Sequence, residues 1–202
     1  MTNRILEVYN DLFNNRERFI DEIFDMEIYK DGFPKLTVID GGAYMGELGF
    51  YYYGVLDKYY GFEPDSKPFE RLKTRVESFG MNRMIVSNKA LGRNGERRVF
   101  HASGAGGSTL TQSTEGELGG SDIMVDTISL AQVIKENNIE KVDILKVDME
   151  NAEKEVFDSP DFPKVAKKIK LIIGEHLEDS RERLESLGFK MKSYPHGAIF
   201  TR

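Results

Sequence analysis

The sequence has no cysteine among its 202 residues, and this absence excludes disulfide bonds, thiolate metal sites and cysteine nucleophiles. It also lacks any run that approaches the roughly 18 apolar residues of a membrane-spanning helix. The first residues include acidic side chains and do not form the apolar core of a signal peptide. We therefore expect a cytoplasmic protein with no membrane partner.

An excess of basic residues is missing as well. The formal net charge is −6 at pH 7, whereas binding to a phosphate backbone requires a basic surface. The densest group of lysines, in residues 164–170, leads directly into an apolar stretch and is typical of a solvated helix end. We expect no nucleic-acid partner, and the composition leaves the oligomeric state open.

The most informative stretch is residues 36–46, where a short apolar strand ends in Asp40 and continues into Gly41, Gly42 and Gly46. In an open α/β sheet, ligands bind just beyond the carboxyl end of such a strand. Glycines remove side chains where a ligand approaches the backbone, and the N–H groups of a following helix favour an anionic group. A tight turn without a ligand is the alternative, because short glycine motifs also occur by chance.

The spacing of these glycines separates the ligand classes. The Gly-x-Gly-x-x-Gly pattern of dinucleotide-binding proteins is broken, because Tyr44 stands at the position of the second glycine. The phosphate loop is incomplete, because Glu47 follows the last glycine where that motif has a lysine. Asp40, an acid before the turn, instead suits a ligand with positive charge, such as the amino group and sulfonium of S-adenosylmethionine.

A second apolar stretch ends in another acid, Glu63, which lies 21 residues after Gly42. An acid at about this interval, at the tip of the second strand, can accept hydrogen bonds from both ribose hydroxyls of an adenosine. Asn88 follows the third expected strand, in a loop from which its side chain could reach the edge of an adenine. Together with Asp40, these residues favour a cofactor of the adenosylmethionine type.

Strand-like and helical stretches alternate along the rest of the chain, and the last two strands form a hairpin around residues 195–197. This order predicts an α/β fold with a doubly wound, mostly parallel sheet that ends in an antiparallel hairpin. We expect one domain over residues 36–202, with a helix over residues 46–58 and a glycine-rich segment, residues 104–120. That segment is either a disordered insert or a substrate flap. Residues 1–35 are predicted to be a helical segment that covers the core or forms a lid over the substrate.

Several motifs together carry a family resemblance. They are Val-Ile-Asp-Gly-Gly-Ala at 38–43 with Gly46, Phe-Glu-Pro at 62–64, Asn-Lys-Ala-Leu at 88–91, Val-Asp-Thr-Ile-Ser at 125–129, Leu-Lys-Val-Asp-Met-Glu at 145–150 and Glu-His at 175–176. In these motifs the chain resembles the FkbM family of methyltransferases. The resemblance implies a class I methyltransferase (Rossmann-like) fold, S-adenosylmethionine as methyl donor, and a hydroxyl oxygen of a small molecule or carbohydrate as acceptor. The chain departs from the family pattern at Tyr44, where asparagine is usual, and at Asn151, where glycine is usual.

The candidate catalytic residues follow two later strands. Asp148 comes directly after the strand expected at 142–147, and Glu175 and His176 follow the strand expected at 169–173. Because a hydroxyl acceptor benefits from a base, His176 is the candidate base, with Glu175 orienting it and Asp148 placed beside the cofactor. The alternatives are a divalent ion held by the three side chains and a purely structural role.

Three other functions are compatible with an α/β fold of this kind. A nucleotide-binding oxidoreductase is disfavoured by the broken glycine pattern. A nucleic-acid N-methyltransferase is disfavoured by the charge, and by Asp-Met-Glu-Asn at 148–151, where such enzymes hold an amino nitrogen with an Asp-Pro-Pro-Tyr-type motif. A non-catalytic methyltransferase-like protein that binds a ligand or a partner is the alternative function.

Overall fold

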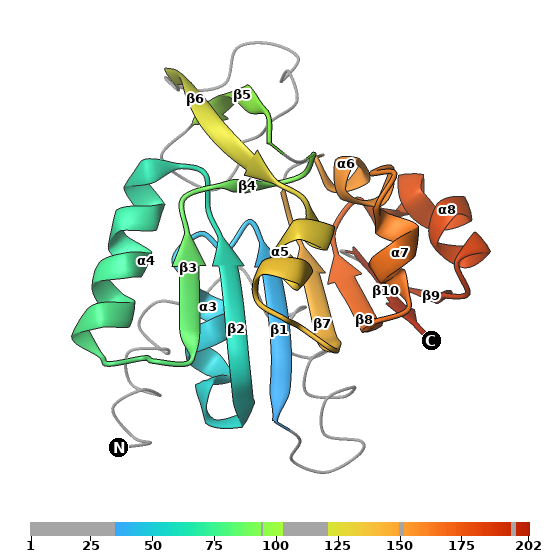
Figure 1. Cartoon of the computed structure of the whole chain (residues 1–202), viewed down its shortest axis with the longest axis horizontal. Helices are drawn as coiled ribbons and strands as arrows, with labels where there is room; N and C mark the ends of the chain where they lie inside the picture. Colours follow the sequence, from blue (N-terminus) through green and yellow to red (C-terminus); the bar gives the residue numbers. More distant parts are fainter. Residues whose placement is uncertain (1–34, 94, 103–120, 150–151, 195–196) are drawn as a thin grey trace.

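The computed structural model of the chain describes residues 35–93, 95–102, 121–149, 152–194 and 197–202. Its centre is a seven-stranded sheet with the order β3-β2-β1-β7-β8-β10-β9 (Figure 1). In that order the strands are Met84–Ser87, Leu56–Phe62, Leu36–Gly41, Val142–Val147, Ile169–Gly174, Gly197–Thr201 and Lys190–Tyr194. Neighbouring strands are parallel except at β10, which runs antiparallel to both β8 and β9. The predicted sheet with its terminal antiparallel hairpin is confirmed.

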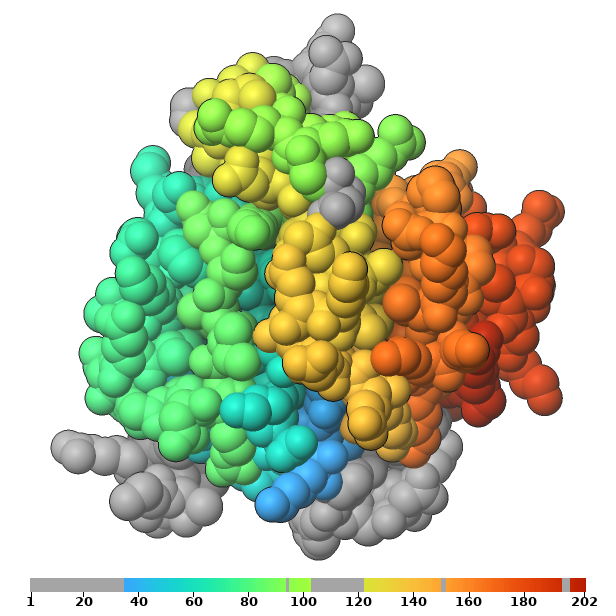
Figure 2. Space-filling model, in the orientation of Figure 1, coloured from blue at the N-terminus to red at the C-terminus, as the bar shows by residue number. Residues whose placement is uncertain are grey.

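Helices cover both faces of this sheet, as a mostly parallel sheet requires. They are α3 (Glu47–Tyr51), α4 (Ser66–Ser78), α5 (Leu130–Glu136), α6 (Glu153–Phe157), α7 (Phe162–Ala166) and α8 (Arg181–Ser186), with the 3-10 helices η2 (Tyr53–Val55) and η3 (Leu177–Ser180). Val38 and Ile144 pack in the core on the side of α3 and α4, whereas Ile39 and Leu145 pack in the core on the side of α5 to α8. Figure 2 shows the molecule from the side of the core that contains Ile39 and Leu145, where α5, α6 and α7 cover the sheet. The alternation of strand side chains therefore builds two cores, one on each face.

A smaller sheet lies beyond the carboxyl ends of the central strands, at the top of Figure 1. Its order is β4-β6-β5, with β4 at Ala90–Leu91, β6 at Ser121–Ile128 and β5 at Arg97–Ala102. β4 follows β3 after two residues and pairs in parallel with the end of β6. The small sheet is thus tied to the edge of the central sheet at which ligands bind in open α/β folds.

The helix predicted over residues 46–58 is wrong in its second half. α3 ends at Tyr51, η2 follows, and β2 already begins at Leu56. Leu56 is 1% exposed and pairs with Leu36 at the start of β1, so burial and strand pairing override the helical pattern of the aromatic residues before it. α4 begins at Ser66, where the Asp65 side chain caps it by accepting a hydrogen bond from the Lys67 N–H.

The predicted N-terminal helical segment and the glycine-rich segment 104–120 lie outside the described residues, apart from Lys35. The turn residues 195 and 196 of the terminal hairpin also lie outside them. In the part of the chain that the structure describes, no helix is both long and apolar enough to cross a membrane.

Candidate active site

The candidate site lies at the carboxyl edge of the central sheet, where neighbouring strands end together. Gly41 of β1 pairs with Phe62 of β2 and with Val147 of β7, and Val147 pairs with Gly174 of β8. The residues that follow these strand ends therefore form one row at the edge where open α/β sheets bind ligands. In spatial order the row is Asn88, Glu63, Gly42, Asp148 and Glu175.

Packing against the rest of the protein requires glycine in the loop between β1 and α3. Gly42 and Gly46 have φ angles of 77° and 76°, in the left-handed region that glycine adopts without strain. A Cβ atom on Gly42 would lie 1.9 Å from the backbone oxygen of Asp148, so a larger residue does not fit there. Gly41 is less restricted, because its Cβ would lie 2.9 Å from the sulfur of Met149, an atom of a flexible side chain. The glycine pattern is therefore required by the packing of the β1–α3 loop against the turn after β7, in addition to any role in binding a ligand.

Glu63 is a buried carboxylate that fixes the backbone on both sides of the second strand tip. Its Oε2 accepts a hydrogen bond from the Tyr44 N–H, and its Oε1 accepts one from the Asp65 N–H, both at 2.8 Å. The side-chain amide of Asn88 donates to the backbone oxygens of Glu63 and Pro64, at 2.8 and 2.9 Å. Burial raises the pKa of Glu63 to about 7, although the two N–H donors oppose that rise.

The raised pKa of Glu63 predicts a pH dependence of stability. The folded state holds this proton more tightly than the unfolded chain does, so the free energy of unfolding falls as the pH rises from 4.5 to about 7. The expected loss is on the order of 3 kcal/mol, since each tenfold change in proton affinity is worth about 1.4 kcal/mol. Chemical denaturation of the wild type and of Glu63→Gln across this pH range measures it as the difference between the two curves. The same pH dependence in both proteins would contradict the prediction.

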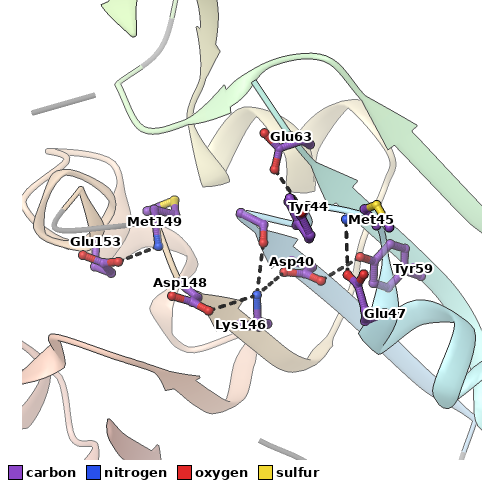
Figure 3. A network of polar contacts seen from close by, with 11 residues as sticks. Asp40, Tyr44, Met45, Glu47, Tyr59, Glu63, Lys146, Asp148, Met149 and Glu153 are labelled. Atoms are coloured by element: carbon purple, nitrogen blue, oxygen red, sulfur yellow. Dashed lines mark hydrogen bonds and ion pairs between the residues drawn. The ribbon is translucent and has the colours of Figure 1, made fainter. Parts of the chain in front are cut away.

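A second set of polar contacts joins the ends of β1 and β7 (Figure 3). The Lys146 ammonium lies 3.2 Å from Oδ1 of Asp40, 3.1 Å from the backbone oxygen of Gly42 and 3.7 Å from Oδ2 of Asp148. The Tyr59 hydroxyl donates to Oδ2 of Asp40 at 2.6 Å. Burial raises the pKa of Asp40, and the charge of Lys146 and the Tyr59 hydroxyl oppose that rise. Both carboxylate oxygens of Asp40 therefore bond to protein groups, and a buried ammonium faces its charge.

Asp148, Glu175 and His176 lie on adjacent strand tips, as their positions after β7 and β8 require. The Asp148 side chain is 23% exposed, against 2% for that of Asp40, so Asp148 is the more open of the two acids around Lys146. Glu175 is partly buried and His176 is exposed. His176 has a φ angle of 51°, a left-handed conformation that is uncommon outside glycine and that clusters at functional sites.

The described side chains give no support to the divalent-ion alternative. Among the residues that the structure describes, no three His, Cys, Asp or Glu side chains come close enough together to hold a metal ion. Glu150 and Asn151, which follow Asp148 and Met149, lie outside the described part of the chain.

Two residues of this region were not singled out from the sequence. Lys146 interrupts the apolar strand β7, and a lysine in a fully buried strand needs a partner, so the sequence did carry a signal. Glu153 is 1% exposed, and its Oε1 accepts a hydrogen bond from the Met149 N–H at 2.5 Å. No such signal marks Glu153, because acidic residues are common in the first turn of any helix.

The chain matches the family model of the methyltransferase FkbM domain over residues 40–193. It belongs to the FkbM methyltransferase family. The predicted family is confirmed, and the matched segment contains every candidate residue of the site, from Asp40 to His176. No curated protein sequence matches this FkbM chain.

Solved structures of methyltransferases have a similar fold. The precorrin-6y C5,15-methyltransferase of Geobacter metallireducens GS-15 is 11% identical, with a TM-score of 0.52 over 95% of this chain and 94% of that one. TrmK of M. capricolum, in complex with S-adenosyl-homocysteine, is 12% identical, with a TM-score of 0.52 over 93% and 68%. The magnesium protoporphyrin IX methyltransferase ChlM of Synechocystis PCC 6803, with bound SAM, is 12% identical, with a TM-score of 0.51 over 93% and 85%. At such identities the likeness shows the fold, and this FkbM chain has the class I methyltransferase fold.

Proposed function

We propose that the protein is an S-adenosylmethionine-dependent methyltransferase that methylates a hydroxyl oxygen of a small molecule or carbohydrate. The observation that carries this proposal is the row of strand tips in which Glu63 and Asp148 lie on either side of the glycine loop. The fold it shares with TrmK, solved with S-adenosyl-homocysteine, and with ChlM, solved with SAM, supports the cofactor.

The residues of the loop fit such a cofactor. Each carboxylate oxygen of Glu63 accepts one backbone N–H and keeps a further lone pair, which suits two ribose hydroxyls. Asn88 fixes the backbone next to Glu63, on the side proposed for the adenine. Tyr44 supplies an aromatic ring beside the glycine loop, and such a ring can stabilise a sulfonium through a cation–π contact. Asp148, partly exposed at the next strand tip, would attract the positive charge of the methionine part.

The role of Asp40 in this proposal is indirect. Its carboxylate bonds to Lys146 and Tyr59, and Lys146 also donates to the backbone oxygen of Gly42. Asp40 would therefore contribute to cofactor binding by holding the shape of the glycine loop rather than by a contact of its own.

When bound, the sulfonium of the cofactor would supply an electrophilic methyl group, and the transfer is an in-line displacement that depends mainly on positioning. The protein would hold the acceptor hydroxyl behind the methyl carbon. His176 would take the hydroxyl proton as the new oxygen–carbon bond forms, while the carbon–sulfur bond breaks with its electron pair left on sulfur. Glu175, the preceding residue, would orient the imidazole.

The cofactor proposal predicts a selective thermal shift. S-adenosylhomocysteine should raise the melting temperature, with a stabilisation of about 2.7 kcal/mol at one hundred times its dissociation constant. NAD should give no shift, because the glycine loop lacks the dinucleotide pattern. Differential scanning fluorimetry with both ligands measures the difference. A folded sample that millimolar S-adenosylhomocysteine fails to stabilise would contradict the cofactor assignment.

Methyl transfer itself is tested with labelled S-adenosylmethionine and a panel of alcohol and sugar acceptors. Label on an acceptor oxygen supports the proposed O-methylation. Binding of the cofactor without turnover on the whole panel would favour the alternative, a methyltransferase-like protein that binds a ligand or partner.

A further inference from the structure

Glu153 is a buried acid on the acceptor side of the site that the proposed mechanism does not use. It is the first residue of α6 and is 1% exposed. Its Oε1 accepts the Met149 N–H at 2.5 Å, and Met149 directly follows Asp148 (Figure 3). Glu153 thus holds the turn that carries Asp148 to the beginning of α6.

The second carboxylate oxygen of Glu153 is the unusual feature. Oε2 is buried and has no hydrogen-bond partner among the residues that the structure describes. A buried polar atom without a partner costs free energy, and native proteins keep few of them. An acid that only favoured the N-terminus of a helix would gain as much at the surface, where water satisfies both oxygens. The free oxygen therefore indicates a partner that arrives when the site is occupied.

His176, the proposed base, is a donor on the segment that packs against α6 and is our candidate for that partner. α6 packs against η3, and His176 is the cap residue that directly precedes η3. Burial raises the pKa of Glu153, and the N–H groups of Met149 and of Glu153 itself oppose the rise. The charge of Asp148 adds to the rise, and a positive charge on His176 opposes it. Asp148 and His176 therefore both act on the charge of Glu153. Glu155, the other acid in the same helical turn, instead forms an ion pair with Arg98.

We infer that Glu153 is a positioning residue for methyl transfer. Its Oε1 fixes the turn that carries Asp148, and its Oε2 accepts the Nδ1–H of His176 in the cofactor-bound protein. The inference rests on the proposed function, in which His176 is the base. With Nδ1–H held by Glu153 in place of Glu175, the Nε2 atom of the imidazole is left free to take the acceptor proton.

Glu153→Gln separates this role from a structural one. The glutamine carbonyl can still accept the Met149 N–H, so the turn and the fold are kept, while the oxygen that receives the imidazole N–H is replaced by an NH₂ group. Glu155→Gln is the matched control, because it removes the same charge from the same helical turn without touching the proposed pair. Both variants are expected to melt cooperatively and to bind S-adenosylhomocysteine with wild-type affinity in calorimetry.

Two measurements decide the outcome. The kcat of Glu153→Gln should fall about 10- to 100-fold with little change in the acceptor KM, as a part of the 10²–10⁴ that a base contributes. In ring-nitrogen NMR of the protein bound to S-adenosylhomocysteine, His176 should show the Nδ1–H tautomer in the wild type and in Glu155→Gln, and lose it in Glu153→Gln. The imidazole nitrogen signals are assigned to His176 by their absence from the spectrum of His176→Asn.

The failures can be told apart. A wild-type kcat together with an unchanged tautomer in Glu153→Gln would overturn this inference and leave the methyltransferase proposal standing. A wild-type protein that binds no S-adenosylhomocysteine would overturn the proposed function, and this inference with it.

Discussion

Lys146→Met is expected to lower the free energy of unfolding by about 3–5 kcal/mol near neutral pH, the usual cost of removing one partner of a buried ion pair. Methionine fills a similar volume but has no donor. Asp40 would keep its charge in the core with the Tyr59 hydroxyl still bonded to it, and the backbone oxygen of Gly42 would lose the ammonium that lies 3.1 Å away. Chemical denaturation of the two proteins measures the loss.

The loss in Lys146→Met should shrink as the pH falls. Without the ammonium, burial raises the pKa of Asp40 further above its ordinary value of 3.8, so the folded state binds a proton that the unfolded chain releases. The free energy of unfolding then falls as the pH rises above that value. The double variant Asp40→Asn, Lys146→Met removes the charge as well and should recover much of the stability near neutral pH.

A surface pair provides the control for this experiment. Lys164 pairs with Asp161, and their side chains are 75% and 48% exposed. Lys164→Met should therefore change stability by less than about 1 kcal/mol. A loss in Lys146→Met no larger than this, or independent of pH and of the charge at Asp40, would contradict the buried-pair interpretation.

His176→Asn is expected to reduce the rate of methyl transfer to an alcohol acceptor by roughly 10²–10⁴-fold, the usual contribution of a general base. Asparagine adopts the left-handed backbone that His176 has, so the turn into η3 should persist. The fold and the affinity for S-adenosylhomocysteine should stay near those of the wild type. Steady-state kinetics and calorimetry measure the two quantities separately.

His101→Asn is the matched control for the loss of an imidazole, because His101 pairs with Asp122 in the small sheet. That variant should retain the wild-type rate. EDTA should leave the activity of the wild type unchanged if His176 is the base. Activity that vanishes in EDTA and returns with magnesium would show that a metal ion, and not His176, activates the acceptor. Full activity in His176→Asn would show that catalysis comes from positioning alone.

Strands β1, β7 and β8 were predictable because each is a short, mostly apolar run that ends beside a glycine or an acidic residue. β7 has the bounds expected from sequence, and the row of Glu63, Gly42 and Asp148 follows directly from the parallel order of the strands. The end of α3 was not predictable from periodicity alone. It is set by the long-range pairing of Leu56 with Leu36, which no local pattern reports.

The polar contacts of Asp40, Lys146 and Tyr59 next to the glycine loop could not be predicted from the sequence for a similar reason. That Lys146 needs a partner follows from its place in an apolar strand. That the partner is Asp40 depends on the register of β1 and β7, which places these two residues side by side. The free oxygen of Glu153 depends on the packing of α6 against its neighbours, and the spacing of residues along the chain carries no record of it.

The close approach of Gly42 to Asp148 has a mechanical consequence. The Asp148 N–H donates to the backbone oxygen of Gly41 at 3.1 Å, the backbone oxygen of Asp148 leaves no room for a Cβ on Gly42, and Lys146 bonds to the oxygen of Gly42 from below. The two turns therefore behave as one rigid block of backbone. A displacement of the glycine loop would therefore move Asp148 with it, so the distance from the loop to the Asp148 carboxylate is set by the fold and not by the conformation of either turn alone.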